Sequence, residues 1–482
     1  MEIWLKLSIL LCVFGFVKEF RPSEPFVTPY LTEEGKNFTD QDIEVIFSTG
    51  TYAYLVEIIF VFLVTDLFRY KPVIVLDGVF AIITWSLLIW GKSILQMQVM
   101  EVFYAFFLAA EVAYYTYIYA QVDREHYQKV TSHTRAAYLF GRALSGIVSQ
   151  TLVSTGTLNY YQLNFISFAA VISATVWALF LPPVKHSIYF NRTNIDRQDV
   201  ITGNEHHGVI IEDSVSKVPS PELSQNAYAE THESMPHSVE THDTSRLQNV
   251  QKGLTNRWKI AYYYLWKDFT SAYTNTYVVK WSCWWALATC GFLQVLNYIQ
   301  LVWELIITEN NMDSNTELYH GAVEAIYTVI GATASLGCGW LRLNWQMVGE
   351  ATLAICSLIE GTLLIVSTMA NSLPAAYTYY ILFGIIFHTM ITVANTEIAE
   401  HLNENSYGLI FGVNTFLALV FQSILTVIVV DERVLALDTR TQFLVYGGYY
   451  MVLGILFGCM SVFTLCKKEI RGQKLWLPKE TE

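Results

Sequence analysis

Twelve separate stretches of apolar residues, each close to the length of a membrane-spanning helix, constrain this chain more than any other feature of its sequence. A helix needs about 20 mostly apolar residues to cross the hydrocarbon core of a bilayer. We predict spans at residues 3–20, 47–67, 72–91, 98–121, 135–157, 161–182, 277–303, 319–340, 346–371, 374–397, 407–430 and 442–466. The fold class that follows is an all-α integral membrane protein with twelve transmembrane helices.

The composition agrees with this fold class. Of the 482 residues 53% are hydrophobic and only 15% are charged, whereas soluble domains carry about 25% charged residues. A net charge of −13 and the lack of any basic run exclude nucleic acid as a partner. The seven cysteines lie in apolar stretches without a C-x-x-C pair, so we expect no disulfide framework, no metal site and no cofactor.

The spans fall into two groups of six. We expect an N-terminal bundle over residues 1–183, a disordered cytoplasmic linker over 184–272, a C-terminal bundle over 273–466 and a cytoplasmic tail over 467–482. The linker is polar, and the spacing of its histidines fits no set of metal ligands. Two six-helix halves joined by a long inner loop are the layout of major facilitator transporters, in which substrate binds between the halves.

Basic residues in the short loops orient the chain. Lys and Arg gather in the loops that face the cytoplasm when both termini are cytoplasmic, as at Arg69, Lys71 and Arg135. Arg21 then falls in an outer loop, and so does the sequon at Asn37, which we expect to be glycosylated.

The first apolar stretch has an alternative interpretation as a signal peptide. Lys6 precedes the apolar run, as in a signal peptide, but no small-residue cleavage site follows it. We therefore keep residues 3–20 as a span.

Ionisable residues inside spans are costly, and each is a candidate functional residue. Only two bases stand inside or near spans, Arg142 and Lys280, whereas the acids are Glu24, Glu57, Asp77, Glu101, Glu111, Glu324, Glu350 and Glu360. A surplus of carboxylates suits a cationic substrate, or a path for protons, better than it suits a polyanion.

Glu111 is the sharpest of these candidates because it stands in the middle of a span. Helical spacing places Tyr104, Tyr114 and Tyr115 on its face. A carboxylate among aromatic rings attracts an organic cation through charge pairing and cation–π contact. The alternative is a structural carboxyl group that is protonated or paired with Arg142.

For the remaining candidates, the residues alone do not decide between a role in binding and a structural role. Glu324 suits a pocket or a structural role equally, and Asn297 suits either a bond to a heteroaromatic ring or a bond between helices. His388 is better explained as a core histidine than as a proton relay. The motifs of nucleotide-binding, hydrolase and zinc-protease sites are absent from the sequence, so we expect a secondary transporter and not an enzyme or an ATP-driven pump.

Four ordered segments resemble the reduced folate carrier family, the folate and thiamine transporters of animals. They are Arg21–Phe26 with Pro29–Leu31, Arg69–Ile74, Glu111–Tyr119 followed by His126–Gln128 and Arg135, and Phe411–Phe416. The resemblance spans nearly the whole chain apart from the linker.

The resemblance implies uptake of a water-soluble vitamin across the plasma membrane by alternating access. Folate carriers have basic residues where this chain has Glu111 and Gln422, so thiamine is the expected substrate. Carried over from the family, Glu111 would pair with the charged or aminopyrimidine end of thiamine and Tyr114 would stack on it. Glu24, Asn297 and Glu324 would line the cavity.

Two residues depart from the thiamine branch of the family. Gly50 stands in place of a Trp, and Arg142 stands in place of an uncharged residue, where it could neutralise Glu111 or bind an anion. A reduced folate transporter therefore remains an alternative, as does a vitamin receptor that does not transport. A proton or an organic anion is a possible counter-substrate, and the sequence does not choose between them.

Overall fold

The computed structural model describes residues 3–32, 36–122, 126–184, 258–259, 261–310, 318–338, 343–402, 406–431 and 434–466. By its contacts the chain divides into two units, residues 1–185 with 268–482 and residues 186–267. Most of the predicted linker and all of the predicted tail lie outside the described residues. Within the predicted linker the structure describes Val184, which is not helical, and residues 258–259 and 261–272, which are helical.

The first unit begins with helices that follow the six N-terminal predictions in order. They are α1 (Ile3–Glu19), the short η1 (Glu24–Phe26) and α2 (Val27–Thr32), α3 (Asp40–Leu67), α4 (Lys71–Trp90), α5 (Ile94–Ala109) with α6 (Glu111–Gln121), α7 (Tyr127–Ser154) and α8 (Tyr160–Ala178). The C-terminal predictions correspond to α11 (Thr276–Glu309), α12 (His320–Cys338), α13 (Trp345–Thr368), α14 (Leu373–Glu400), α15 (Tyr407–Val429) and α16 (Thr439–Leu465).

Polar capping residues fix where several of these helices begin. The side chains of Thr39, Ser93 and Asn159 each accept a hydrogen bond from the backbone N–H three residues later, and the acidic or amide side chain at that third position bonds back. Such a capping box satisfies N–H groups that the first turn of a helix leaves free. The starts of α3, α5 and α8 are thus set by capping residues in the sequence.

Within the described residues, nine helices are long and apolar enough to cross a membrane. They include one continuous span from α5 into α6, whereas α1, α7 and α12 fall short of that standard. The predicted fold class is confirmed, and each of the twelve predicted stretches overlaps a described helix. Nine rather than twelve of the crossings are supported by length and hydropathy.

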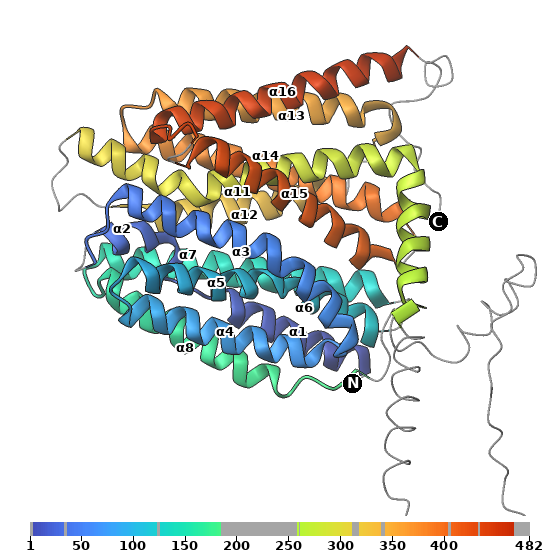
Figure 1. The fold of residues 1–482 in the computed structure, drawn as a ribbon, viewed down its shortest axis with the longest axis horizontal. Helices are drawn as coiled ribbons and strands as arrows, with labels where there is room; N and C mark the ends of the chain where they lie inside the picture. Colours follow the sequence, from blue (N-terminus) through green and yellow to red (C-terminus); the bar gives the residue numbers. More distant parts are fainter. Residues whose placement is uncertain are drawn as a thin grey trace, which may run out of the picture. The chain divides into compact units, whose positions relative to one another are not determined.

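The helices of the first unit pack as two bundles (Figure 1). Helices α1 to α8 contact one another, as α1 does α7 and α4 does α8, and helices α11 to α16 do the same, as α13 does α16. The bundles meet where α7 packs on α12 and where α3 packs on α15. The second and fifth long helices of each bundle therefore form the interface, which positions a site between them.

The long helices of this unit run between two opposite ends. We call the end at which α1, α4 and α7 begin the terminal face, and the end at which α3, α5 and α8 begin the connector face. Asn37 lies at the connector face, exposed and with a φ of 52°.

Candidate functional site

A cavity of about 410 Å³ lies between the two bundles. Its walls come from α1, η1, α3, α4, α5, α6 and α7 of the first bundle and from α11, α12, α14 and α15 of the second. Volumes of about 300–1,000 Å³ are typical of sites for small molecules. Because both bundles contribute lining residues, a ligand here would contact both of them, and its contacts would change if one bundle moved against the other.

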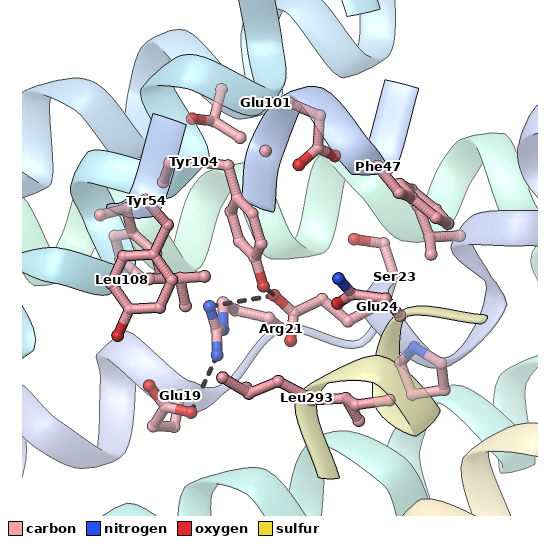
Figure 2. A pocket seen from close by; sticks show the side chains of 18 of the residues that line it. Glu19, Arg21, Ser23, Glu24, Phe47, Tyr54, Glu101, Tyr104, Leu108 and Leu293 are labelled. Carbon is pink, nitrogen blue, oxygen red and sulfur yellow. Dashed lines mark hydrogen bonds and ion pairs between the residues drawn. The ribbon is translucent and has the colours of Figure 1, made fainter. Parts of the chain in front are cut away.

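Arg21 projects into this cavity from the segment that joins α1 to η1 (Figure 2). The sequence predicts Arg21 in an outer loop, and the residue does lie between helices, but it is only 4% exposed, which the sequence does not predict. Its Nη2 lies 2.9 Å from Glu19 Oε2 and its Nη1 lies 2.9 Å from Glu24 Oε1. Tyr104 also donates a hydrogen bond of 3.0 Å to Glu24 Oε1. Arg21 and two carboxylates thus form a compact polar cluster on one wall.

A second buried ion pair supports that wall. Lys18 Nζ lies 2.7 Å from Asp77 Oδ2 on α4, and both side chains are less than a tenth exposed. The Lys18 ammonium and the Arg21 guanidinium both lie over the Phe107 ring, at 4.3 Å and 4.9 Å from its centroid. Each of these two cations is therefore already matched by carboxylates.

Arg142 on α7 meets Glu324 on α12 across the interface of the bundles. Its Nε lies 2.6 Å from Glu324 Oε1, and its Nη2 donates to the Tyr327 hydroxyl at 3.2 Å. The sequence leaves open whether Arg142 neutralises Glu111, and the structure pairs it with Glu324 instead. An ion pair between the two halves results.

Glu101 and Glu111 are the carboxylates that remain. Both line the cavity, and neither makes a hydrogen bond or an ion pair with another residue that the structure describes. The Glu101 carboxylate lies directly against Gly50 on α3, where a Cβ would collide with its Oε2. Unpaired carboxylates in a low-dielectric cavity strongly favour a cationic ligand.

The charges around the cavity do not cancel. The cations are Lys18, Arg21 and Arg142, and the carboxylates are Asp77, which pairs with Lys18, together with Glu19, Glu24, Glu101, Glu111 and Glu324. With every group ionised, the carboxylates outnumber the cations by three. Aromatic side chains complete the walls, including Phe47, Tyr54, Trp85 and Tyr104, and such rings offer their faces to a cation or a flat heterocycle.

Six of the seven substrate residues expected from the sequence line the cavity. They are Glu24, Glu111, Arg142, Asn297, Glu324 and Gln422. The Asn297 amide donates a hydrogen bond of 3.3 Å to the Thr51 hydroxyl, which links α11 to α3. Gln422 is 2% exposed on α15.

Tyr114 is not among the residues that line the cavity. Its hydroxyl donates to the backbone oxygen of Leu11 at 2.8 Å, and its ring packs 5.4 Å from that of Phe14, so it holds α6 against α1. Glu111 and Tyr114 lie three residues apart in the same helix, α6, yet only Glu111 lines the cavity, because the Tyr114 side chain packs against α1. The side chain of Tyr115 lies outside the described residues.

Sequence reasoning missed Arg21 and Lys18 as cavity groups. Arg21 follows the first apolar stretch, where cations are ordinarily assigned to a loop, whereas Lys18 stands inside the predicted span 3–20, in the last turn of α1. The signal that could have found them is the Arg21-Pro22-Ser23-Glu24-Pro25 segment, whose two prolines stop α1 and start η1. His388, predicted as a core residue, lines the cavity and stacks on Tyr327 with their rings 5.6 Å apart.

The bundles are in contact with each other at the connector face. The Phe26 ring stacks on His320 at 5.5 Å, and the backbone N–H of Thr28 donates to Gln300 at 3.0 Å. A Cβ on Gly146 of α7 would lie 2.5 Å from the backbone oxygen of Gly321 on α12, so backbones touch there. These contacts join the two bundles between the cavity residues and the connector face.

Solved structures with the same arrangement of helices are membrane transporters. The POT family transporter PepTSo superposes with a TM-score of 0.62 at 10% identity, over 97% of this chain and all of that one. The nucleoside transporter NupG gives a TM-score of 0.57 at 11% identity, over 94% and 99%. At such identities the likeness shows the fold alone, a two-bundle arrangement of long helices.

Sequence comparison then identifies the family. Residues 2–445 match the profile described as reduced folate carrier, and the chain belongs to that family. It is 40% identical to thiamine transporter 2 of Homo sapiens (95% of this chain, 90% of the relative) and 38% identical to thiamine transporter 1 of Mus musculus (97% and 92%). It is also 37% identical to folate transporter 1 of Caenorhabditis elegans (96% and 94%). The resemblance expected from the sequence motifs is confirmed.

Proposed function

We propose that this protein is a secondary-active transporter of a water-soluble vitamin, and that the vitamin is thiamine. The observation that supports a cation is the pair of carboxylates, Glu101 and Glu111, that face the cavity without a partner among the described residues. Thiamine carries a fixed positive charge and two aromatic rings. Its charge suits the carboxylates, and its rings suit the aromatic walls.

The charge balance also argues against the folate alternative. A folate brings carboxylates into a cavity that already has a surplus of them. The guanidinium groups of Arg21 and Arg142 pair with Glu19, Glu24 and Glu324. An anion would have to displace one of these carboxylates, at a cost of several kcal/mol for each buried pair that is broken.

Transport by alternating access fits the way the bundles meet. The cavity has walls from both bundles, and the connector face is closed by contacts between them, including those of Phe26, Thr28 and Gly146. A rocking of one bundle against the other would break these contacts and expose the cavity on that side. A receptor that does not transport would need no such change.

The test is uptake of labelled thiamine and labelled folate, side by side, in cells expressing the full chain. Saturable thiamine uptake, with unchanged thiamine recovered inside, supports the proposal. Folate uptake without thiamine uptake would refute the assignment of substrate. Saturable binding without accumulation would leave only the receptor alternative.

We further propose that the protein lies in the plasma membrane with both termini in the cytoplasm and that Asn37 is glycosylated. The position of Asn37 at the connector face, exposed and in a turn, supports this. Removal of N-linked glycan should shift the wild-type band on a gel and leave that of Asn37→Gln unchanged. An epitope at the N-terminus should be reached by antibody only after permeabilisation.

A further inference from the structure

The second bundle contains another cavity, at the terminal face and separate from the first. It has a volume of about 340 Å³, and we call it the end pocket. Its walls come from the first turns of α11 and α13, the last turns of α16 and His401 just after α14. None of its lining residues also lines the cavity between the bundles. The proposed transport of thiamine therefore leaves it unexplained.

Aromatic rings line part of the end pocket. Trp281 and Trp345 meet edge to face with their centroids 6.4 Å apart, and the Tyr277 ring lies 6.1 Å from Trp281 and 4.5 Å from His401. Tyr277 is held in place because its hydroxyl donates to Glu397 at 2.5 Å. Among the described residues, the cations recorded over ring faces lie in the first bundle and not on these rings. Such a cluster of electron-rich faces is suited to an alkylammonium group.

A cation and two helix N-termini lie beside these rings, since Lys280 follows Tyr277 by one turn on α11 and Trp345 is the first residue of α13. Lys280 pairs with Glu350, and an ammonium group has three N–H donors, so two remain for a ligand. Helices α11 and α13 both begin at this pocket, at residues 276 and 345; the Asn275 side chain caps α11, and the N-terminus of α13 favours an anion. The α13 start has no side-chain cap from Asn344. A phosphate group suits the Lys280 ammonium and the α13 N-terminus.

The pocket as a whole is close to neutral, because Lys280 and Glu350 compensate each other. A ligand with both an ammonium and a phosphate group, and no net charge, matches the rings and the Lys280 ammonium together. The pocket also lies at the ends of membrane-crossing helices, which is the depth of lipid headgroups. We propose that the end pocket binds a zwitterionic phosphoalkylammonium group, the headgroup of phosphatidylcholine or phosphatidylethanolamine, or the same group in a soluble molecule.

The experiment measures thermal unfolding of the purified full-length protein in detergent while short-chain phosphatidylcholine is added below its micelle concentration. We expect a saturable rise of several degrees in the midpoint. Short-chain phosphatidylglycerol, which lacks the ammonium group, should give a much smaller rise. Equal rises with both lipids would overturn the proposal.

Variants locate the effect. Trp345→Leu and Lys280→Gln should each reduce the rise at least fivefold at a fixed lipid concentration, whereas Trp90→Leu is a matched control because Trp90 is an exposed aromatic residue of the first bundle. An unchanged rise in both end-pocket variants would refute the site.

Soluble phosphocholine separates the two sources of the ligand. A rise as large as that with the lipid, and lost in Trp345→Leu, supports a soluble ligand. A rise only with the lipid supports a membrane headgroup.

Discussion

Neutralising Glu101 or Glu111 tests the charge argument most directly, because neither carboxylate has a partner among the described residues. A change to Gln keeps the shape of the side chain and removes only the charge. It breaks no internal ion pair, so the folded protein should not be weakened. A cationic substrate, by contrast, loses its attraction to that carboxylate.

The size of the effect follows from Coulomb's law. Two unit charges about 4 Å apart attract by about 4 kcal/mol at an effective dielectric constant of about 20. The Gln side chain retains a hydrogen-bond acceptor, which recovers about 1 to 2 kcal/mol. The remaining loss of about 2 to 3 kcal/mol corresponds to an increase of about 30- to 150-fold in the KM for thiamine.

The assay is initial-rate uptake of labelled thiamine into cells, with the amount at the cell surface measured by biotinylation. Glu57→Gln is the matched control, since Glu57 is a half-buried glutamate of α3 that does not line the cavity. Both Glu101→Gln and Glu111→Gln should raise KM while Glu57→Gln does not. Wild-type KM in both cavity variants, at equal surface amounts, would show that cavity charge does not select the substrate.

Three further substitutions probe the same cavity. Gly50→Ala forces the Glu101 carboxylate from its place, at about 1 kcal/mol of rotamer strain, so the KM for thiamine should rise several-fold; an unchanged KM would mean that this placement is not used. Arg142→Gln leaves Glu324 without its guanidinium and should lower the thermal midpoint, whereas the double variant Arg142→Gln/Glu324→Gln should regain most of it; a double variant no more stable than the single would contradict a paired role. Gln422→Lys adds a cation to the wall and should reduce thiamine uptake at equal surface expression, and no change would place Gln422 outside the pathway.

Much of the fold could be predicted from the sequence because hydropathy and helix length are local properties. Each predicted stretch overlaps a helix, and the boundaries at Thr39, Ser93 and Asn159 are set by residues within three positions. What could not be predicted is the direction in which a side chain points after a helix stops. Arg21 turns inward only because Glu19 and Glu24 lie beside it in the folded chain.

The sequence predicts the negative charge of the site but not which acid pairs with which base. An excess of carboxylates in the spans indicates a cation, and Glu24, Glu111 and Glu324 do line one cavity. Which base neutralises which acid depends on contacts between residues far apart in sequence, such as the 182 positions that separate Arg142 from Glu324. Tyr114 shows the same limit, since a hydrogen bond to Leu11, 103 positions earlier in the chain, holds its side chain against α1 and out of the cavity.

The close approach of Gly146 and Gly321 offers a way to shift the protein between conformers by a single substitution at the connector face. A methyl group on Gly146 would meet the backbone of α12 at 2.5 Å, and a backbone cannot yield as a flexible side chain can. Gly146→Ala should therefore act as a wedge that shifts the resting population toward the conformer open on that side. A cysteine placed there should react with a small thiol reagent added from outside the cell, which makes this glycine pair a handle for trapping the second conformer for structure determination.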